Sequence, residues 1–216
     1  MASYRTVLSE GQDEIIEKMS RFIGIALPVE SEEQAEERIA ACRKQYWDSS
    51  HVVYAYRIGQ PAHTERSTDD GEPSHTAGVP ILSYLKKEGL TKILVMVIRY
   101  FGGTLLGTGG LVRAYTLAAR KGCEAAGILS VGAYLKMSLS LDYTRLGKIQ
   151  YELAQKDYSV IGTEYTDKIR MEVLIRAEER DSFIRHITEV SDGTVIPEET
   201  EAVNAAYLDG KWHFFP

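Results

Sequence analysis

The feature that most constrains this chain is a buried strand that runs directly into a glycine-rich turn and then a helix. Residues 92–98 contain four Val or Ile residues and no turn former, which is typical of a strand covered on both faces. Thr104 or Thr108 is expected to cap the following helix, which reaches about Ala126. The glycines between them allow backbone conformations that other residues forbid. They are Gly102, Gly103, Gly107, Gly109 and Gly110.

The rest of the first half predicts two more strands and two more helices. Ser31 is a suitable N-cap with Gln34 three residues on, and Thr76 opens a later helix that has Pro80 near its first turn. Residues 59–74 are polar and are expected to form a long loop. The expected strands are 22–29 and 51–58, and the expected helices are 31–46 and 76–88.

The second half alternates apolar and polar residues more regularly. Its pattern predicts the order strand, helix, strand, strand, helix, strand, which is that of a ferredoxin-like sheet with helices on one face. A break near 127–132 separates the halves, so we expect two domains, 1–131 and 132–216. Asp209-Gly210 predicts a turn before a short aromatic tail. The expected elements are strands at 135–142, 158–165, 169–175 and 194–206 and helices at 143–157 and 183–190.

Composition indicates an ordinary globular protein. The N-terminus lacks the pattern of a signal peptide and no apolar run is long enough to span a bilayer, so we expect a cytoplasmic protein that does not enter membranes. Cys42 and Cys123 stand alone and are expected to be reduced core thiols rather than zinc ligands or a disulfide. No cofactor is expected.

Charge is unevenly distributed. The formal net charge is −6, which argues against a generic nucleic-acid binder. Most of the acidity lies C-terminal, whereas residues 86–121 hold seven basic residues against one acid, Glu88. A local basic surface on an acidic protein is therefore possible.

The glycine segment fails the known phosphate-loop patterns. A P-loop needs Lys-Ser/Thr where Thr108-Gly109 stands, and the dinucleotide fingerprint lacks its last glycine. A sharp structural turn and a recognition surface remain as interpretations.

The loop RSTDDGEPSHTAG, residues 66–78, is a second candidate. Its carboxylates and His75 could form a metal site, and an enzyme or ligand-binding protein could use the cleft between this loop and the glycine turn. The spacing matches no metal motif, and Asp-Asp-Gly is also a common turn. Ser-His neighbours and the cysteines lack the arrangement of a nucleophile with its base.

Several motifs resemble the IMPACT/YigZ family. They are IRYFGG at 98–103, LGTGGLVRAY at 106–115, SRFI at 20–23, AYR at 55–57, DDGEPS at 69–74 and TAG at 76–78. The resemblance runs nearly end to end. It implies an N-terminal α+β domain like domain IV of elongation factor G and a C-terminal ferredoxin-like domain like its domain V. Eukaryotic members of the family regulate translation by binding a partner protein.

Together these observations predict a non-enzymatic, translation-associated protein of two α+β domains that binds RNA, the ribosome or a translation-related protein. Arginines would neutralise phosphates or carboxylates, and Tyr100 would stack on a base. The loop carboxylates are alternative partners for Arg99 or Arg113. An enzyme that works with or without a bound metal and a pure protein-interaction module remain alternatives. The predicted contact residues are Arg99, Tyr100, Gly102, Gly103, Gly107, Arg113 and Arg120, with Asp69, Asp70, Gly71, Glu72, Ser74 and His75 from the loop.

Overall fold

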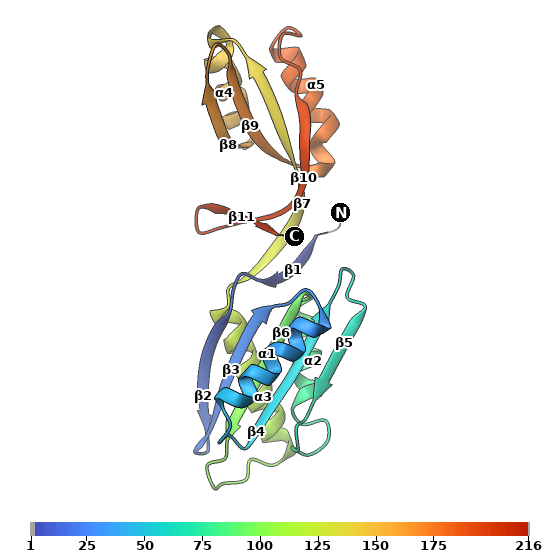
Figure 1. Ribbon diagram of the computed structural model, residues 1–216, viewed down its shortest axis with the longest axis vertical. Coiled ribbons are helices and arrows are strands. Elements are labelled where there is room, and N and C mark those ends of the chain that lie inside the picture. Colours follow the sequence, from blue (N-terminus) through green and yellow to red (C-terminus); the bar gives the residue numbers. More distant parts are fainter. Residues whose placement is uncertain (1–2, 216) are drawn as a thin grey trace. The chain divides into compact units, whose positions relative to one another are not determined.

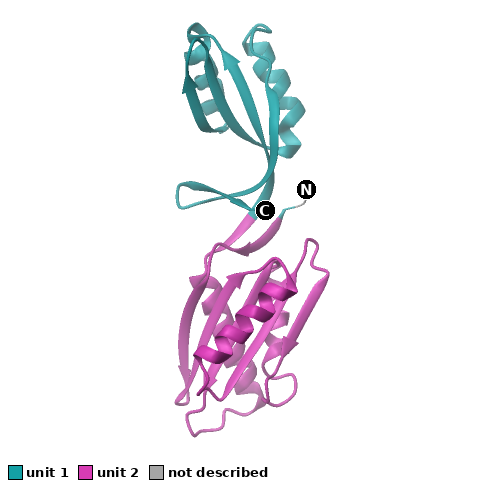
Figure 2. Ribbon diagram, viewed as in Figure 1, with its two compact units in different colours: residues 1–3, 131–216 teal, residues 4–130 magenta. Residues whose placement is uncertain are grey.

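A computed structural model describes residues 3–215 as two compact units (Figure 2). One unit spans Tyr4–Ser130, and the other comprises residue 3 and residues 131–215. The expected division after residue 131 falls beside this boundary. Each unit mixes helices with an antiparallel sheet, so the predicted two-domain α+β fold is confirmed.

The N-terminal unit is built on a five-stranded antiparallel sheet (Figure 1). Strand β6 lies at its centre, paired with β3 on one side and with β4 on the other. Every residue from Ile93 to Arg99 is buried, which confirms the strand expected to be covered on both faces. The sheet order is β2 (Gly11–Glu17), β3 (Ser20–Pro28), β6 (Ile93–Tyr100), β4 (His51–Ile58) and β5 (Thr64–Thr68); β1 (Tyr4–Val7) precedes it in the chain.

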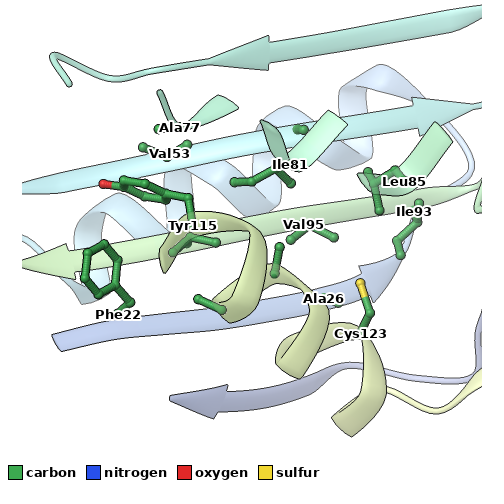
Figure 3. Close-up of a cluster of buried hydrophobic side chains, with 14 of the residues drawn as sticks. Phe22, Ala26, Val53, Ala77, Ile81, Leu85, Ile93, Val95, Tyr115 and Cys123 are labelled. Carbon is green, nitrogen blue, oxygen red and sulfur yellow. The ribbon is translucent and has the colours of Figure 1, made fainter. Parts of the chain in front are cut away.

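Helices cover both faces of this sheet. Helix α1 (Glu32–Gln45) packs on one face, and Figure 1 shows it crossing in front of the strands. Helices α2 (Gly78–Lys87) and α3 (Thr108–Ala125) pack on the other. Figure 3 shows the core beneath them, to which Phe22 of β3, Val95 of β6 and Tyr115 of α3 belong. The rings of Phe22 and Tyr115 pack edge to face, with centroids 5.2 Å apart.

Helices α2 and α3 run in the same direction. Strands β5 and β6 are both antiparallel to β4, so both end at the same end of the sheet. Each strand is followed by a loop and then by a helix that returns along the sheet, α2 after β5 and α3 after β6. Both helices therefore begin near the carboxyl end of β6.

The predicted start of α1 is confirmed in detail. The Gln34 amide donates to Ser31 Oγ at 3.3 Å, and the Gln34 side chain accepts from the Glu30 amide at 2.9 Å. These bonds satisfy amides that a helix start leaves without partners.

Two expectations for this unit were wrong, and two strands were missed. Strands β1 and β2 were not predicted; β2 is an edge strand whose exposed side chains include acids and give no apolar pattern. Residues 59–74 are not a continuous loop, since they contain β5. Helix α3 has Gly107 at its N-cap, with no capping bond from a side chain of residues 3–215, so neither Thr104 nor Thr108 caps it.

The second unit has the predicted ferredoxin-like order. Its sheet runs β11-β10-β7-β9-β8, with every neighbouring pair antiparallel. Alternate residues of β7 and β9 meet Phe183 and Ile187 of α5 in one apolar core. The predicted turn at Asp209-Gly210 leads to β11, where Trp212 packs on Tyr134 and Tyr207. The elements are β7 (Ile128–Leu141), α4 (Leu146–Gln155), β8 (Ser159–Tyr165), β9 (Ile169–Arg176), α5 (Arg180–Val190), β10 (Glu198–Leu208) and β11 (Lys211–Phe215).

Both cysteines are core thiols, as expected. Burial raises the pKa of Cys42 to about 11 and that of Cys123 to about 12, so both stay protonated and unreactive at neutral pH. None of the described helices is long and apolar enough to cross a membrane.

Candidate functional site

The acidic loop, residues 69–77, is held by its own carboxylates. Asp69 accepts hydrogen bonds from the amides of His75, Ala77 and Gly78 at 2.8 to 3.0 Å. These amides surround the start of α2, where a carboxylate satisfies unpaired donors and complements the helix dipole. The Asp69 carboxylate therefore caps the start of α2 from outside the helix, whose N-cap residue is Ala77.

The second carboxylate of the loop, that of Asp70, binds the loop to strand β4 and helix α1. Asp70 accepts from the Val52 amide and from Arg43, each at 2.7 Å. Its carbonyl oxygen lies 2.7 Å from Nδ1 of His51. Gly71 follows it, and its backbone has a positive φ of 87°.

The third carboxylate lies inside the unit. Glu72 Oε1 accepts from Arg99 at 2.5 Å and from the Tyr115 hydroxyl at 2.7 Å. Burial and then the bond to Glu72 raise the pKa of Tyr115, so this phenol remains a donor. The cluster joins the loop, β6 and α3. Such a buried pair costs several kcal/mol to break because it leaves one charge uncompensated, typically about 3–5 kcal/mol.

Arg99 is part of this internal cluster rather than of the surface. It is 5% exposed, and its guanidinium also donates to Ser20 Oγ at 3.3 Å. The guanidinium carbon lies 5.3 Å from the ring centroid of Phe22 and 5.4 Å from that of Phe101. Its pairing with the loop, one of the two predicted roles, is observed. The buried side chain therefore presents little surface for direct contact with a partner.

Tyr100 lies apart from the rest of the predicted contact residues. It packs with the core beneath α1, on the opposite face of the sheet from the core that holds Tyr115. Its hydroxyl donates to Asp48 at 2.9 Å, and Arg21 lies 6.0 Å from its ring. The structure therefore does not bring Tyr100 onto one face with α3.

The glycine turn packs tightly at its start and is open at its end. A Cβ on Gly102 would lie 2.0 Å from the backbone carbon of Met19, so only glycine fits beside the β2–β3 turn. Gly107, at the N-cap of α3, has φ of 72°, a conformation that favours glycine. Of the three turn glycines predicted as contact residues, Gly103 and Gly107 are exposed and Gly102 is half-buried.

We call the exposed residues of this turn and of the first turns of α3 the glycine-turn surface. Its most exposed side chain is Leu105, at 82%, and Phe101 is 49% exposed. Arg113 turns back toward the first turn of α3, because its Nη1 lies 3.7 Å from the position of a Cβ on Gly109. The surface comprises Phe101, Gly103, Thr104, Leu105, Gly107, Thr108, Gly109 and Arg113.

The remaining predicted residues lie outside this surface. Ser74 is exposed on the acidic loop, whereas His75 and Arg120 line a groove between α2 and α3. Sequence reasoning missed Tyr115 and Ser20, which anchor Glu72 and Arg99. Both fall within the family motifs, and that was the one signal that could have identified them.

Comparison with known proteins gives matches to both units. A family model described as the Impact N-terminal domain matches residues 18–123, and one described as a domain of unknown function (DUF1949) matches residues 139–194. The chain is 39% identical over 191 residues to the IMPACT family member YvyE of Bacillus subtilis (strain 168), covering 88% of each. It is 31% identical to the IMPACT family member YigZ of Escherichia coli (strain K12), covering 82% of this chain and 88% of YigZ.

A solved structure supports the same fold. A crystal structure described as that of a hypothetical protein aligns with a TM-score of 0.58 and 28% identity. The alignment covers 93% of this chain and 98% of the other, so it includes both units.

Proposed function

The chain belongs to the IMPACT family, and on this basis we propose that it is a non-enzymatic, translation-associated protein whose glycine-turn surface binds ribosomal RNA. The theme of translation follows from the resemblance to family members that regulate it and to domains of an elongation factor. Fold alone does not carry a function, so the contact must be argued from the site.

One observation carries the proposal: Arg113 lies beside a helix start that no described side chain caps. The amides in the first turn of α3 point outward from an N-terminus that favours anions. The Arg113 guanidinium lies within 3.7 Å of a Cβ position in the same turn. Within residues 3–215, no ion pair engages Arg113. Backbone amides and one unpaired guanidinium together suit a phosphate group.

The apolar side chains of the surface suit nucleotides better than a free phosphate. Phe101 presents an exposed ring to which a base could stack, and Leu105 lies close to it in sequence. The chain carries a net charge of −6, so attraction to RNA is confined to this local surface and should depend strongly on salt.

The metal-assisted alternative lacks geometric support. Asp69, Asp70 and Glu72 already accept hydrogen bonds from backbone amides, Arg43, Arg99 and Tyr115, so these carboxylates serve the fold. Among the residues that the structure describes, no group of three or more His, Cys, Asp or Glu is placed to hold a metal ion.

The test is binding of the full chain to intact ribosomes and to ribosomal RNA across a salt series. Arg113→Ala should weaken RNA binding about tenfold, because one charge-assisted phosphate contact is lost. It should also reduce the slope of log affinity against log salt by about 1.

Arg185→Ala supplies the matched control, because Arg185 is an exposed arginine on a helix of the other unit. It should leave affinity and slope unchanged. Equal losses in both variants, or binding that ignores salt, would refute the proposal. Ribosome binding that survives nuclease treatment would instead indicate a protein partner.

A further inference from the structure

Most of the basic segment at residues 86–121 is neutralised within the fold. Five of its seven cations pair with acids: Lys86 with Glu65, Lys92 with Glu30, Arg99 with Glu72, Arg120 with Glu124 and Lys121 with Asp13. The other two are Lys87 and Arg113. Lys87 and Arg120 belong to one groove, which the proposed RNA contact does not use.

This groove lies between α2 and α3 and has a volume of about 580 Å³. That volume is within the usual range for ligand sites, roughly 300–1,000 Å³. Its lining includes Val79, Ser83 and Lys87 from α2 and Val112, Thr116 and Arg120 from α3.

Two matching rows of side chains run along the groove. On α2 the positions i, i+4 and i+8 are Val79, Ser83 and Lys87; on α3 they are Val112, Thr116 and Arg120. Residues at this spacing share one face of a helix. Because the helices run in the same direction, the valines lie at one end, the hydroxyls in the middle and the cations at the other end.

Few acidic side chains neutralise the cationic end of the groove. Glu88, the one acid among the described lining residues, is bound by Arg5 through its carboxylate at 3.1 Å and its carbonyl oxygen at 2.5 Å. Arg120 approaches Glu124 at 3.6 Å, but both side chains are about half exposed and such a pair contributes little. Within residues 3–215, no ion pair engages Lys87. The cations at this end therefore remain available to a partner.

We propose that the α2–α3 groove docks an acidic, amphipathic segment of a partner protein. An apolar side chain of that segment lies against Val79 and Val112, and its carboxylates pair with Lys87 and Arg120. Eight residues of helix separate the two ends, a rise of about 12 Å. A helical peptide spans this distance in about two turns, so its apolar and acidic anchors lie seven or eight residues apart.

An RNA strand fits this groove less well. Apolar side chains occupy one end of the groove, and its two cations, Lys87 and Arg120, lie at the other. Nucleic-acid grooves instead follow successive phosphates with a row of cations and stack bases on aromatic rings. Charge complementarity with an apolar anchor therefore favours the acidic peptide.

The probe is a random peptide library displayed on phage and selected against the immobilised full chain. Enriched sequences should combine an apolar residue with acidic residues about two helical turns away. Lys87→Glu should reduce the affinity of a selected peptide by more than about tenfold, because an attractive pair becomes repulsive. Lys148→Glu, which reverses an exposed charge on α4, should not.

A second variant tests the apolar end. Val79→Glu should abolish binding of the same peptide, and hydrogen exchange of α2 should confirm that each variant remains folded. Enrichment of basic or neutral peptides, or indifference to both groove variants, would overturn the proposal. Loss of ribosomal RNA binding in Lys87→Glu would show instead that RNA occupies the groove. Peptide binding that persists in Arg113→Ala separates this site from the proposed RNA contact.

Discussion

The acidic loop and the glycine turn lie at the same end of the N-terminal unit, but they use their polar groups in opposite ways. The loop is rich in charge, and all three of its carboxylates accept hydrogen bonds from within the unit. The turn has no charged residue between Phe101 and Gly110, and it leaves a helix start without a side-chain cap among the described residues. In this unit the charged side chains of the loop therefore stabilise the fold. The uncharged glycine turn leaves backbone amides free to donate to a ligand.

The sharpest test of this comparison is Glu72→Ala. The substitution leaves the buried Arg99 guanidinium without its ionic partner, so the N-terminal unit should lose about 3–5 kcal/mol of stability. Amide hydrogen exchange of β6, read by mass spectrometry, measures the loss within this unit. Glu37→Ala, an exposed change on α1, should cost less than about 0.5 kcal/mol. A loss below about 1 kcal/mol at Glu72 would mean that the loop carboxylate does not support the fold.

Asp69→Ala should have the next largest effect. Three amides lose their acceptor, so α2 should be destabilised by about 2 kcal/mol, the upper end of the range for a helix cap. Urea denaturation and hydrogen exchange of α2 measure this change. Asp69→Asn keeps a side-chain oxygen and should cost less than Asp69→Ala. A neutral Asp69→Ala variant would contradict the capping role.

Gly107→Ala tests the other side of the comparison. Alanine must adopt φ near 72°, which should cost about 1–2 kcal/mol. Gly147→Ala is the control, because Gly147 lies inside α4 with open space around it among the described residues, and alanine there should be neutral or stabilising. Equal denaturation midpoints for the two variants would show that α3 can start without a left-handed residue.

Leu105→Ser should have the smallest effect. The side chain is 82% exposed, so its removal should change stability by less than about 0.5 kcal/mol. The melting temperatures of Leu105→Ser and Leu106→Ser, each compared with that of the unaltered chain, measure this. Leu106 packs partly against the core, so Leu106→Ser should destabilise the chain more than Leu105→Ser. If Leu105→Ser is as destabilising as Leu106→Ser, the glycine turn is a packed element rather than an open surface.

Much of the fold could be predicted from local pattern. The apolar run of β6, the cap of α1 at Ser31 and the alternation in β7 and β9 each express a period or a terminus that nearby residues encode. Strands β1 and β2 could not be predicted in this way. The exposed edge strand β2 depends on backbone pairing with β3, which its own sequence does not reveal.

The site was less predictable because its roles depend on contacts between distant segments. Glu72 meets Arg99 across 27 residues and Tyr115 across 43. Arg99 belongs to a recognisable sequence motif, but the motif does not reveal whether its guanidinium is buried or exposed. Tyr100 and Arg99 are neighbours in the motif, and the alternation of a strand sends them to opposite faces.

The central position of β6 also sets the order in which this unit can be completed during synthesis. β2 with β3 and β4 with β5 form two hairpins, and each leaves an unpaired edge until β6 is inserted between them. Arg21 of β3 pairs opposite Tyr100 of β6, so β3 must wait for about eighty residues of chain before its second edge is covered. During that interval the nascent chain exposes two strand edges to neighbouring chains, which makes this the stage most prone to aggregation.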